Sequence, residues 1–508
     1  MTGDRRRDDI RIAIVGGGFG GIGSAVKLKT AGFTNIRIYE KEEGAGGTWR
    51  VNTYPGCEVD IPSHSYSFSF MGWDWTRTHA RQPELMAYTE AILDRFDLRP
   101  HFTFGTSVEL VEWQEDSSTY LVHTSDGASA EYDVVVTAVG FLSVPKYPDW
   151  PGLDSFEGPR FHTARWDHSV DLRGKRVAVV GTGSTAAQVV PEVATIAEHV
   201  HVFQREPGWI NAKNDRDFSP FERSLYHLPL AARLHRLKIF YDYYKRFGSF
   251  DVESRAQAKT RARSVDFIRS AIPDEQLAAK VTPNYPWGCK RPVLSDSFYP
   301  ALMRDNVTLV AAPVVRATSN GVVDAAGTEH EVDVLVMSTG FRTTDYLDTV
   351  EVRGRGGVEL HDYWAGRPRA YLGVTVPRFP NLFLIYGPNT NGGGSIIAQQ
   401  ERQAEVMVWA LKKLVRRGAT TVDTTPEALD RWIRWVDQKL ATDASAMEAG
   451  CTNYYHSGSG ANATQWPGTH LRYFVMTKLW RGRGITFSPP AAAGRREPAA
   501  PARITSRD

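Results

Sequence analysis

Two glycine-rich segments have the residue types and the spacing needed to bind the pyrophosphate of a dinucleotide. The first is Gly-Gly-Gly-Phe-Gly-Gly at 16–21, and the second is Gly-Thr-Gly-Ser-Thr-Ala at 181–186. Glycine lets the backbone approach a pyrophosphate closely, and the N-terminus of a following helix supplies free N–H groups. The residues predicted to contact the two nucleotides are Gly16, Gly18, Phe19, Gly20 and Gly21 in the first segment and Gly181, Thr182, Gly183, Ser184 and Thr185 in the second.

The charges that follow these segments differ in sign. Glu40 lies 24 residues after Gly16, and Arg205 lies 24 residues after Gly181. A carboxylate at this position accepts hydrogen bonds from a ribose 2′-hydroxyl and repels a 2′-phosphate, so the first site is predicted to bind FAD or NAD. A guanidinium matches a phosphate, so the second site is predicted to bind NADP, unless Arg205 is only a solvated strand end. The simplest interpretation is that the chain binds one flavin and one NADPH.

The segment after Glu40 offers further contacts for a flavin. Gly47 and Thr48 are small enough for close backbone approach, and Trp49 offers a flat apolar surface for the isoalloxazine ring, with a plain core position as the alternative. Asp60 lies in a turn rich in Gly and Pro that directly follows this segment. The predicted flavin-binding set is completed by Asp60, Tyr66 and Val108.

Repeated strands and helices are expected to position these residues. Short β-rich runs at 11–15 and 176–180 enter the two glycine segments, helical stretches follow, and second strands at 36–39 and 200–204 end on the two charges. Closing strands at 133–136 and 333–336 each run into a Gly-Phe pair. The sequence therefore predicts an α/β fold with two Rossmann-like dinucleotide-binding domains.

The second copy of this pattern is longer than the first, and the excess is rich in charged and aromatic residues at helical spacing. We place a helical insertion there, at about 215–285. The predicted domains are an FAD-binding part at 1–150, an NADP-binding domain at 151–341, a second FAD-binding part at 342–488 and a disordered tail at 489–508, which is rich in Pro and Ala.

Composition narrows the class of protein further. Lys and Arg number 60 against 58 Asp and Glu, so no general binding to nucleic acid is expected. The three cysteines, Cys57, Cys289 and Cys451, form no close pair in the sequence, which argues against a disulfide scaffold, a zinc site or a redox dithiol. No apolar stretch is long enough to span a membrane, and no signal peptide is evident. We expect a cytoplasmic oxidoreductase without a metal or membrane partner.

The linker before the second glycine segment carries a further pattern, F-x-G-x-x-x-H-T-x-x-W-D, with Phe156, Gly158, His162, Trp166 and Asp167. A His–Trp pair in a linker usually serves packing. In this position, however, the pattern resembles the linker of the type I Baeyer–Villiger monooxygenases, and with both glycine segments the resemblance covers about residues 10–487. It implies an enzyme that uses FAD, NADPH and O₂ to convert a small-molecule ketone to an ester or lactone through a C4a-peroxyflavin, with sulfoxidation as a side activity.

The resemblance also implies roles for particular residues. Arg291 is expected to stabilise the peroxyflavin and the developing oxyanion, and Asp60 to orient Arg291. Lys290 is expected to join Arg205 on the NADP 2′-phosphate, although a solvated basic pair is the alternative. His162 is interpreted as a hinge residue. Tyr454 stands where the family commonly places a Trp at the nicotinamide ribose, which leaves NADP retention and substrate choice open.

Two other functions are compatible with the nucleotide sites. One is a heteroatom hydroxylase that oxygenates N or S, which the Trp166-Asp167 pair argues against. The other is an NADPH-binding flavoprotein that acts as a redox sensor without oxygenating a substrate. The natural substrate and the oligomeric state are not predicted.

Overall fold

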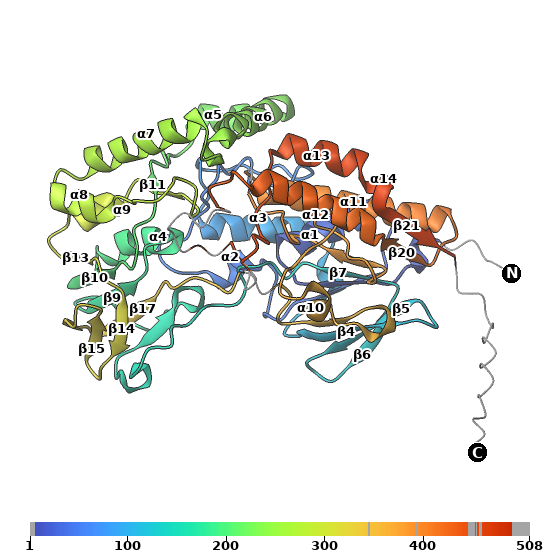
Figure 1. The fold of residues 1–508 in the computed structure, drawn as a ribbon, viewed down its shortest axis with the longest axis horizontal. Helices are drawn as coiled ribbons and strands as arrows, with labels where there is room; N and C mark the ends of the chain where they lie inside the picture. The colour runs from blue at the N-terminus through green and yellow to red at the C-terminus, as the bar shows by residue number, and fades with distance from the viewer. Residues whose placement is uncertain are drawn as a thin grey trace, which may run out of the picture.

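The computed structural model describes residues 6–343, 346–392, 394–445, 453, 455–456 and 460–489. Tyr454 and the predicted tail beyond Pro489 lie outside these residues. Two units lie side by side, each built around a five-stranded parallel sheet (Figure 1). The unit drawn at the right contains the beginning of the chain and its last third, and the unit at the left contains the middle of the chain.

The first sheet has the strand order β19-β7-β1-β2-β3. Its central strand β1 is buried throughout, as expected for a parallel sheet covered on both faces. Ile12 and Ile14 pack with residues of the helices, whereas Ala13 and Val15 pack against a second, smaller sheet. The elements of this layer are β1 (Ile12–Val15), β2 (Ile36–Tyr39), β3 (Phe102–Thr103), β7 (Val134–Thr137), β19 (Leu382–Leu384), α1 (Phe19–Thr30), α3 (Gln82–Arg95) and α11 (Ile396–Arg416).

The second sheet repeats this plan with the order β13-β10-β9-β17-β8. In both sheets the strand that enters the glycine segment is central, and the strand ending on the predicted charge lies beside it. The elements are β8 (Arg160–His162), β9 (Arg176–Val180), β10 (His199–Phe203), β13 (Val307–Val310), β17 (Val334–Met337), α4 (Ser184–Val193) and α9 (Phe298–Leu302). The predicted α/β class with two Rossmann-like sheets is confirmed, and the predicted strand bounds agree to within two residues.

Helices fill the segment for which an insertion was predicted. Ser219 caps α5, because its hydroxyl accepts from the Glu222 N–H while the Glu222 carboxylate accepts from Ser219, and Pro220 occupies the first turn. The helices here are α5 (Pro220–Tyr226), α6 (Pro229–Arg246), α7 (Arg255–Ala271) and α8 (Glu275–Val281). In Figure 1, α5, α6 and α7 lie along the upper edge and α8 lies below α7 at the left. The helix α6 approaches α13 (His470–Leu479) of the first unit, and the Phe240 and His470 rings are 5.4 Å apart.

The remaining elements complete the two units and were not predicted individually. The strands are β4 (Val108–Gln114), β5 (Thr119–Thr124), β6 (Ser129–Tyr132), β11 (Ile210–Asn211), β12 (Val293–Leu294), β14 (Val314–Ala317), β15 (Gly321–Asp324), β16 (Glu329–Glu331), β18 (Glu351–Arg353), β20 (Thr421–Thr424) and β21 (Ile485–Ser488). The helices are α2 (Thr48–Val51), α10 (Leu360–Trp364), α12 (Pro426–Leu440) and α14 (Arg481–Gly484), with short 3₁₀ turns η1 (Arg7–Asp9), η2 (Arg99–His101), η3 (Leu153–Ser155), η4 (Thr163–Arg165), η5 (Phe247–Phe250) and η6 (Arg355–Gly357).

The two units are packed against each other rather than merely tethered. One continuous hydrophobic cluster runs from Ile14 and Trp49 of the first unit to Val177 and Ala186 of the second. The two segments in which the chain passes from one unit to the other are also hydrogen-bonded to each other. The Lys146 N–H donates to the Gly340 carbonyl at 2.9 Å. The relative position of the nucleotide sites is therefore set by core packing as well as by the linkers.

Candidate functional site

The first glycine turn has a backbone that only glycine permits. Gly16 has φ +105°, and a Cβ there would lie 2.6 Å from the Ala138 carbonyl oxygen. A Cβ on Gly21 would lie 1.9 Å from the Gly16 carbonyl oxygen, so the helix can approach the turn only without a side chain. Gly18 is the N-cap of α1 and offers no side chain to the first N–H groups. The turn therefore fits a nucleotide pyrophosphate.

Glu40 lies at the end of β2 beside this turn and is buried. Its carboxylate accepts hydrogen bonds from the Gly17 N–H at 2.6 Å and the Glu42 N–H at 2.9 Å. Burial raises the pKa of Glu40, while the two backbone N–H groups lower it. Two donors hold the carboxylate next to the glycine turn, in the position that a ribose-binding acid needs.

An aromatic group borders the same turn. A Cβ on Gly47 would lie 2.8 Å from the Cα of Gly18, so the two segments touch through their glycines. The indole Nε1 of Trp49 donates to the Tyr66 hydroxyl at 3.1 Å, and the Phe19 and Tyr66 rings are 5.8 Å apart. Thr48 begins α2 beside them. The structure thus brings together most of the predicted flavin-binding residues.

Val108 is the member of that set with a different environment. It begins β4 and is buried in the cluster between β1 and the smaller sheet. No side-chain chemistry follows from this position, so a contact with a nucleotide would have to use the backbone.

The second glycine turn repeats the geometry of the first. Gly181 has φ +117°, and a Cβ there would lie 2.4 Å from the Ser338 carbonyl oxygen. Gly183 is the N-cap of α4, and Ser184 and Thr185 form the first turn of that helix. Ala186 is fully buried, so the methyl group that replaces the third glycine is accommodated.

Two basic side chains accompany this second turn. Arg205 is exposed just after β10, and Lys290, which follows the helical insertion, forms an ion pair with the neighbouring Glu206. Burial lowers the pKa of Lys290, the Arg205 charge lowers it further, and the ion pair with Glu206 opposes both. A phosphate that binds between Arg205 and Lys290 would relieve the repulsion between them.

Asp60 and Arg291 form an ion pair that joins the two units. The Nη2 of Arg291 lies 3.3 Å from Oδ2 of Asp60, and the side chains are 40% and 15% exposed respectively. Gln188 on α4 donates to the other oxygen of Asp60, also at 3.3 Å. Burial raises the pKa of Tyr66, and the charges of Arg291 and Asp60 also act on its hydroxyl. The pair therefore lies close to the aromatic group of the first turn.

The linker residues serve structure in this fold. His162 is fully buried, and its ring nitrogens contact the Gly340 carbonyl at 3.0 Å and the Ala164 N–H at 3.1 Å. Burial lowers its pKa, so the ring is neutral near pH 7. Trp166 packs on Phe161 with ring centroids 5.0 Å apart.

The other linker residues are equally local. Gly158 has no room for a side chain, because a Cβ there would lie 2.3 Å from the Asp333 carbonyl oxygen and 2.7 Å from the Phe156 ring. Asp167 caps its own turn by accepting from the Ser169 N–H at 2.9 Å. None of these contacts involves the Asp60–Arg291 pair.

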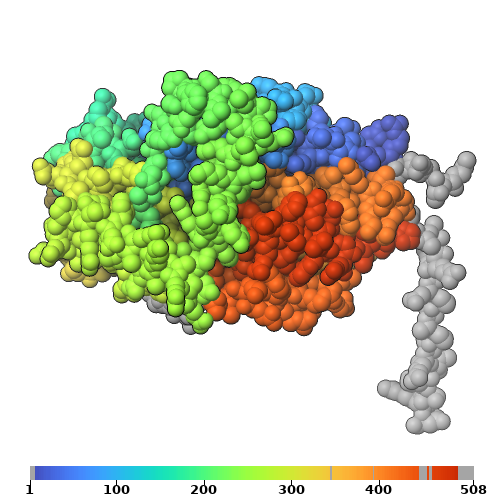
Figure 2. Space-filling view, turned by 90° about the horizontal axis from the view of Figure 1, so that it is seen from above, coloured from blue at the N-terminus to red at the C-terminus, as the bar shows by residue number. Residues whose placement is uncertain are grey.

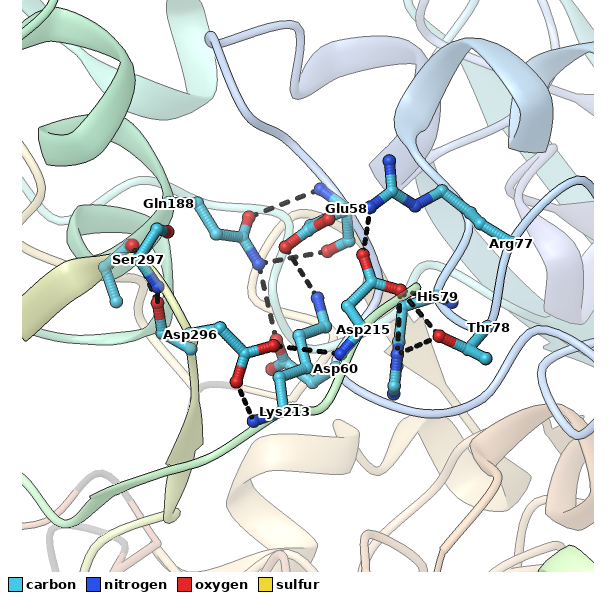
Figure 3. A network of polar contacts seen from close by, with 12 residues as sticks. Glu58, Asp60, Arg77, Thr78, His79, Gln188, Lys213, Asp215, Asp296 and Ser297 are labelled. Atoms are coloured by element: carbon cyan, nitrogen blue, oxygen red, sulfur yellow. Dashed lines mark hydrogen bonds and ion pairs between the residues drawn. The ribbon is translucent and has the colours of Figure 1, made fainter. Parts of the chain in front are cut away.

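A network of charges between the units was missed by sequence reasoning (Figure 3). Lys213 is almost fully buried and lies 2.7 Å from Glu58, two residues before Asp60. Asp215 accepts from Arg77, Thr78 and His79 of the first unit. Burial raises the pKa of Asp215, but these hydrogen bonds outweigh it and hold the pKa well below the usual range.

Asp296 completes the network by accepting from the backbone N–H groups of 213, 214 and 215 at 2.8–3.0 Å. The network therefore fixes the loop of Glu58 and Asp60 against the second unit. Only the pair of acids at 58 and 60 could have signalled it, because an isolated Lys213 in a polar segment is indistinguishable from a surface lysine.

The two described cysteines differ in their bonding. Cys57 is free and buried, and burial raises the pKa of its thiol to about 12. Cys289 is buried and disulfide-bonded, a cross-link that the expectation of no disulfide scaffold did not include. Sequence spacing missed it because a disulfide joins residues that the fold, not the chain, brings together. Cys451 lies outside the described residues.

Two other features are absent from the part of the chain that the structure describes. Among the residues that the structure describes, no three His, Cys, Asp or Glu side chains are grouped to hold a metal ion. In the same residues, no helix combines the length and the apolar character needed to cross a bilayer.

Comparisons with known proteins agree with this architecture. Residues 13–225 match the family model described as pyridine nucleotide-disulphide oxidoreductase. Baeyer–Villiger monooxygenases of Streptomyces coelicolor and Pseudomonas aeruginosa are 40% and 38% identical to the chain, covering 93% and 95% of it and 91% and 92% of their own lengths. A phenazine N-monooxygenase of Lysobacter antibioticus is 34% identical, covering 82% of the chain and 85% of its own length.

Solved structures give the same result. A cyclohexanone monooxygenase from Rhodococcus sp. Phi1 bound to NADP⁺ superposes with a TM-score of 0.85 at 31% identity, over 94% of this chain and 99% of that chain. Two Rossmann-like units with nucleotide turns of opposite charge, and such relatives, define a flavin monooxygenase that uses FAD and NADPH. The chain belongs to the Baeyer–Villiger monooxygenases, the flavoenzymes that convert a ketone to an ester or lactone.

Proposed function

We propose that the Asp60–Arg291 pair is the centre at which this chain oxidises its ketone substrate. The observation that supports this proposal is the 3.3 Å ion pair between a loop of the first unit and a loop of the second. Only at this pair do charged groups from both nucleotide-binding units meet beside the aromatic residues Trp49 and Tyr66, among the contacts described above.

The first unit would hold FAD. Gly16, Gly18 and Gly21 would admit the pyrophosphate, and Glu40 would accept the ribose hydroxyl. When bound and reduced by NADPH, the flavin activates O₂ for attack on a carbonyl group. Trp49 and Tyr66, both buried, would form an apolar wall that keeps water from the reacting atoms.

Arg291 would stabilise the negative charge that develops on the carbonyl oxygen of the substrate. A guanidinium stays protonated at any working pH, so it supplies this charge without a proton transfer. Asp60 and, through it, Gln188 would hold the guanidinium in one orientation. Arg291 is thus the proposed catalytic residue and Asp60 its positioning partner.

The second unit would bind NADPH. Gly181 and Gly183 would admit its pyrophosphate, and Arg205 with Lys290 would bind the 2′-phosphate. The pairing of Lys290 with Glu206 keeps its ammonium group near Arg205. Tyr454 is proposed as the contact to the nicotinamide ribose, on the sequence resemblance alone.

The domain boundaries and the cellular location also stay proposals. We propose that 1–150 and 342–488 form the FAD-binding domain and 151–341 the NADP-binding domain, in agreement with the two sheets. A small-molecule ketone and O₂ are the proposed partners, and the cytoplasm is the proposed location.

A ketone panel tests the proposal most directly. FAD-loaded protein with NADPH and O₂ is expected to give esters or lactones from cyclic or aryl ketones, with one NADPH consumed for each product. The 34% identity to a phenazine N-monooxygenase favours a second candidate, oxygenation of nitrogen. Products from an amine panel, with none from ketones, would replace the first function by the second. If NADPH is oxidised only with release of H₂O₂ on both panels, both candidate functions are contradicted.

A further inference from the structure

One face of the molecule combines exposed apolar side chains with a high density of basic ones. The helix α6 exposes Leu230, Leu234, Leu237, Tyr241 and Tyr244, which recur at three- and four-residue spacing and so form one stripe. Of its 18 residues only Ile239 is buried, whereas soluble helices usually bury a whole apolar stripe. The apolar stripe of α6 thus points to solvent.

A second stripe lies on α13, which is in contact with α6 through His470 and Phe240. Leu471, Phe474, Val475 and Leu479 are all exposed there, Leu471 and Leu479 by more than 60%. Figure 2 shows the green segment that contains α6 beside the red segment that contains α13 on a single face of the molecule. The two stripes therefore belong to one surface, which we call the α6–α13 face.

The charges on this face are strongly one-sided. The exposed basic residues of α6 are Arg233, Lys238, Lys245 and Arg246, and those of α13 and α14 are Arg472, Lys478 and Arg483. The single acid of α6 is Asp242, which is neutralised by Lys238 at 2.8 Å and Lys245 at 3.1 Å. No acidic residue occurs from His470 to Gly484. Since the whole chain is nearly neutral, this excess is local.

A basic groove continues the face beyond α13. It has a volume of about 780 Å³ and is lined by α1, α11, α13 and α14. Its only acidic residue is Glu405, which pairs with Lys27 and Arg402. Its basic residues are Arg7, Lys27, Lys412, Lys413, Arg416, Lys478 and Arg481. The groove fits anionic phosphate headgroups.

We propose that the α6–α13 face docks on an anionic lipid bilayer, with the leucines and tyrosines entering the interface and the basic residues binding the headgroups. Exposed apolar stripes edged by Lys and Arg have this binding mode. A second copy of this chain is a poor occupant, because two such faces would bring like charges together. A membrane-surface role differs from the expectation, drawn from composition, of no membrane partner.

One residue of α6, Tyr243, lies within electrostatic reach of the proposed reaction centre. Burial raises the pKa of Tyr243, and the charges of Arg291 and Asp60 also act on its hydroxyl. Tyr243 of α6 is thus close enough to the Asp60–Arg291 pair for both charges to act on its hydroxyl. An apolar ketone dissolved in the bilayer would meet α6 first.

Vesicle binding by the FAD-loaded full chain tests the proposal. Sedimentation with vesicles of mixed phosphatidylcholine and phosphatidylglycerol is expected to capture at least ~10-fold more protein than phosphatidylcholine alone at low salt, and added salt should reduce the excess. Leu234→Glu with Leu237→Glu should lower binding ~10-fold or more for each leucine. Arg472→Glu with Lys478→Glu should lower it ~5-fold or more for each charge.

The matched control is Ile196→Glu, at an exposed apolar residue beside β10 of the second unit. It should bind vesicles as the unchanged protein does. Flavin absorbance and turnover of a small water-soluble ketone should be unchanged in all variants; if the leucine pair prevents flavin loading, the Arg472 and Lys478 variant decides. Absence of binding to the anionic vesicles, or an equal loss in Ile196→Glu, would overturn the proposal. A dimer in light scattering that the leucine variant abolishes would also overturn it, by showing that a second copy covers the face.

Discussion

Replacement of Arg291 by Ala should separate the reduction of the flavin from the oxygenation of the substrate. The Arg291 guanidinium is paired with Asp60 at 3.3 Å. The proposed contacts to the NADP phosphate are two other residues, Arg205 and Lys290. We therefore expect NADPH to reduce the flavin at nearly the normal rate in the variant. Ester formation should fall by about 10²–10³, the cost of removing one donor to a developing oxyanion.

Removal of the guanidinium also leaves the charge of Asp60 without its ion-pair partner. At 3.3 Å the attraction between Arg291 and Asp60 is about 5 kcal/mol at an effective dielectric of 20 and about 1.3 kcal/mol in water. Because the Arg291 side chain is 40% exposed, the attraction between the two side chains is nearer to the value in water. Without the guanidinium, Asp60 keeps only the Gln188 hydrogen bond, and its charge then repels the oxyanion.

Two measurements decide the matter. Anaerobic stopped-flow absorbance gives the rate of flavin reduction by NADPH, and product analysis beside H₂O₂ release gives the fate of the oxygen. Arg291→Lys is the control that keeps a charge but loses the planar pairing with Asp60, and it should retain intermediate activity. If Arg291→Ala still forms ester at the unchanged rate, the guanidinium has no role in oxygenation. An equal loss of flavin reduction would place Arg291 on NADPH instead.

Three further outcomes are expected. Arg205→Ala should weaken NADPH binding by about 10–100-fold and leave NADH unchanged in steady-state kinetics, whereas equal losses would show that no phosphate is bound there. Gly21→Ala should abolish flavin loading, because the added Cβ would lie 1.9 Å from the Gly16 carbonyl oxygen. Gly183→Ala should load FAD normally, because the space around its added Cβ is open to 4 Å. Equal flavin content in the two variants would contradict this packing argument. Burial lowers the pKa of His64 to about 3. Between pH 6.5 and about 3 the imidazole is therefore protonated only in the unfolded chain, so the free energy of unfolding falls as the pH falls. The loss is about 1.4 kcal/mol at pH 5.5, and His64→Phe should flatten the fall of the unfolding temperature with pH.

Local patterns in the sequence were sufficient for much of the fold. The glycine turns at 16–21 and 181–186 could be recognised because a turn needing positive φ and close packing leaves few choices of residue. Strands such as 176–180 were placed correctly because parallel strands buried on both faces are continuously apolar. The small sheet of β4, β5, β6 and β18 was missed, because β18 pairs with a strand from a distant part of the chain.

Some residues of the candidate site could be identified from the sequence, and others could not. Glu40 and Arg205 were identified from their distance to a glycine turn, since both ends of that interval belong to one supersecondary unit. Gln188 and Lys213 were not identified, because their function depends on contact with Glu58 and Asp60 of the other unit. An amide in a helix or a lysine in a loop has no local feature that reveals such a contact.

By itself, therefore, the sequence determined that the chain carries two nucleotide sites of unlike charge and to which family it belongs. Spacing along the chain specifies the shape of a turn and the charge at the end of its strand, because these are encoded within about 25 residues. Only the tertiary structure decided that Asp60 meets Arg291, and that α6 and α13 share one exposed face. Contacts between residues more than 200 positions apart depend on how whole units pack, and that packing is a property of the complete core.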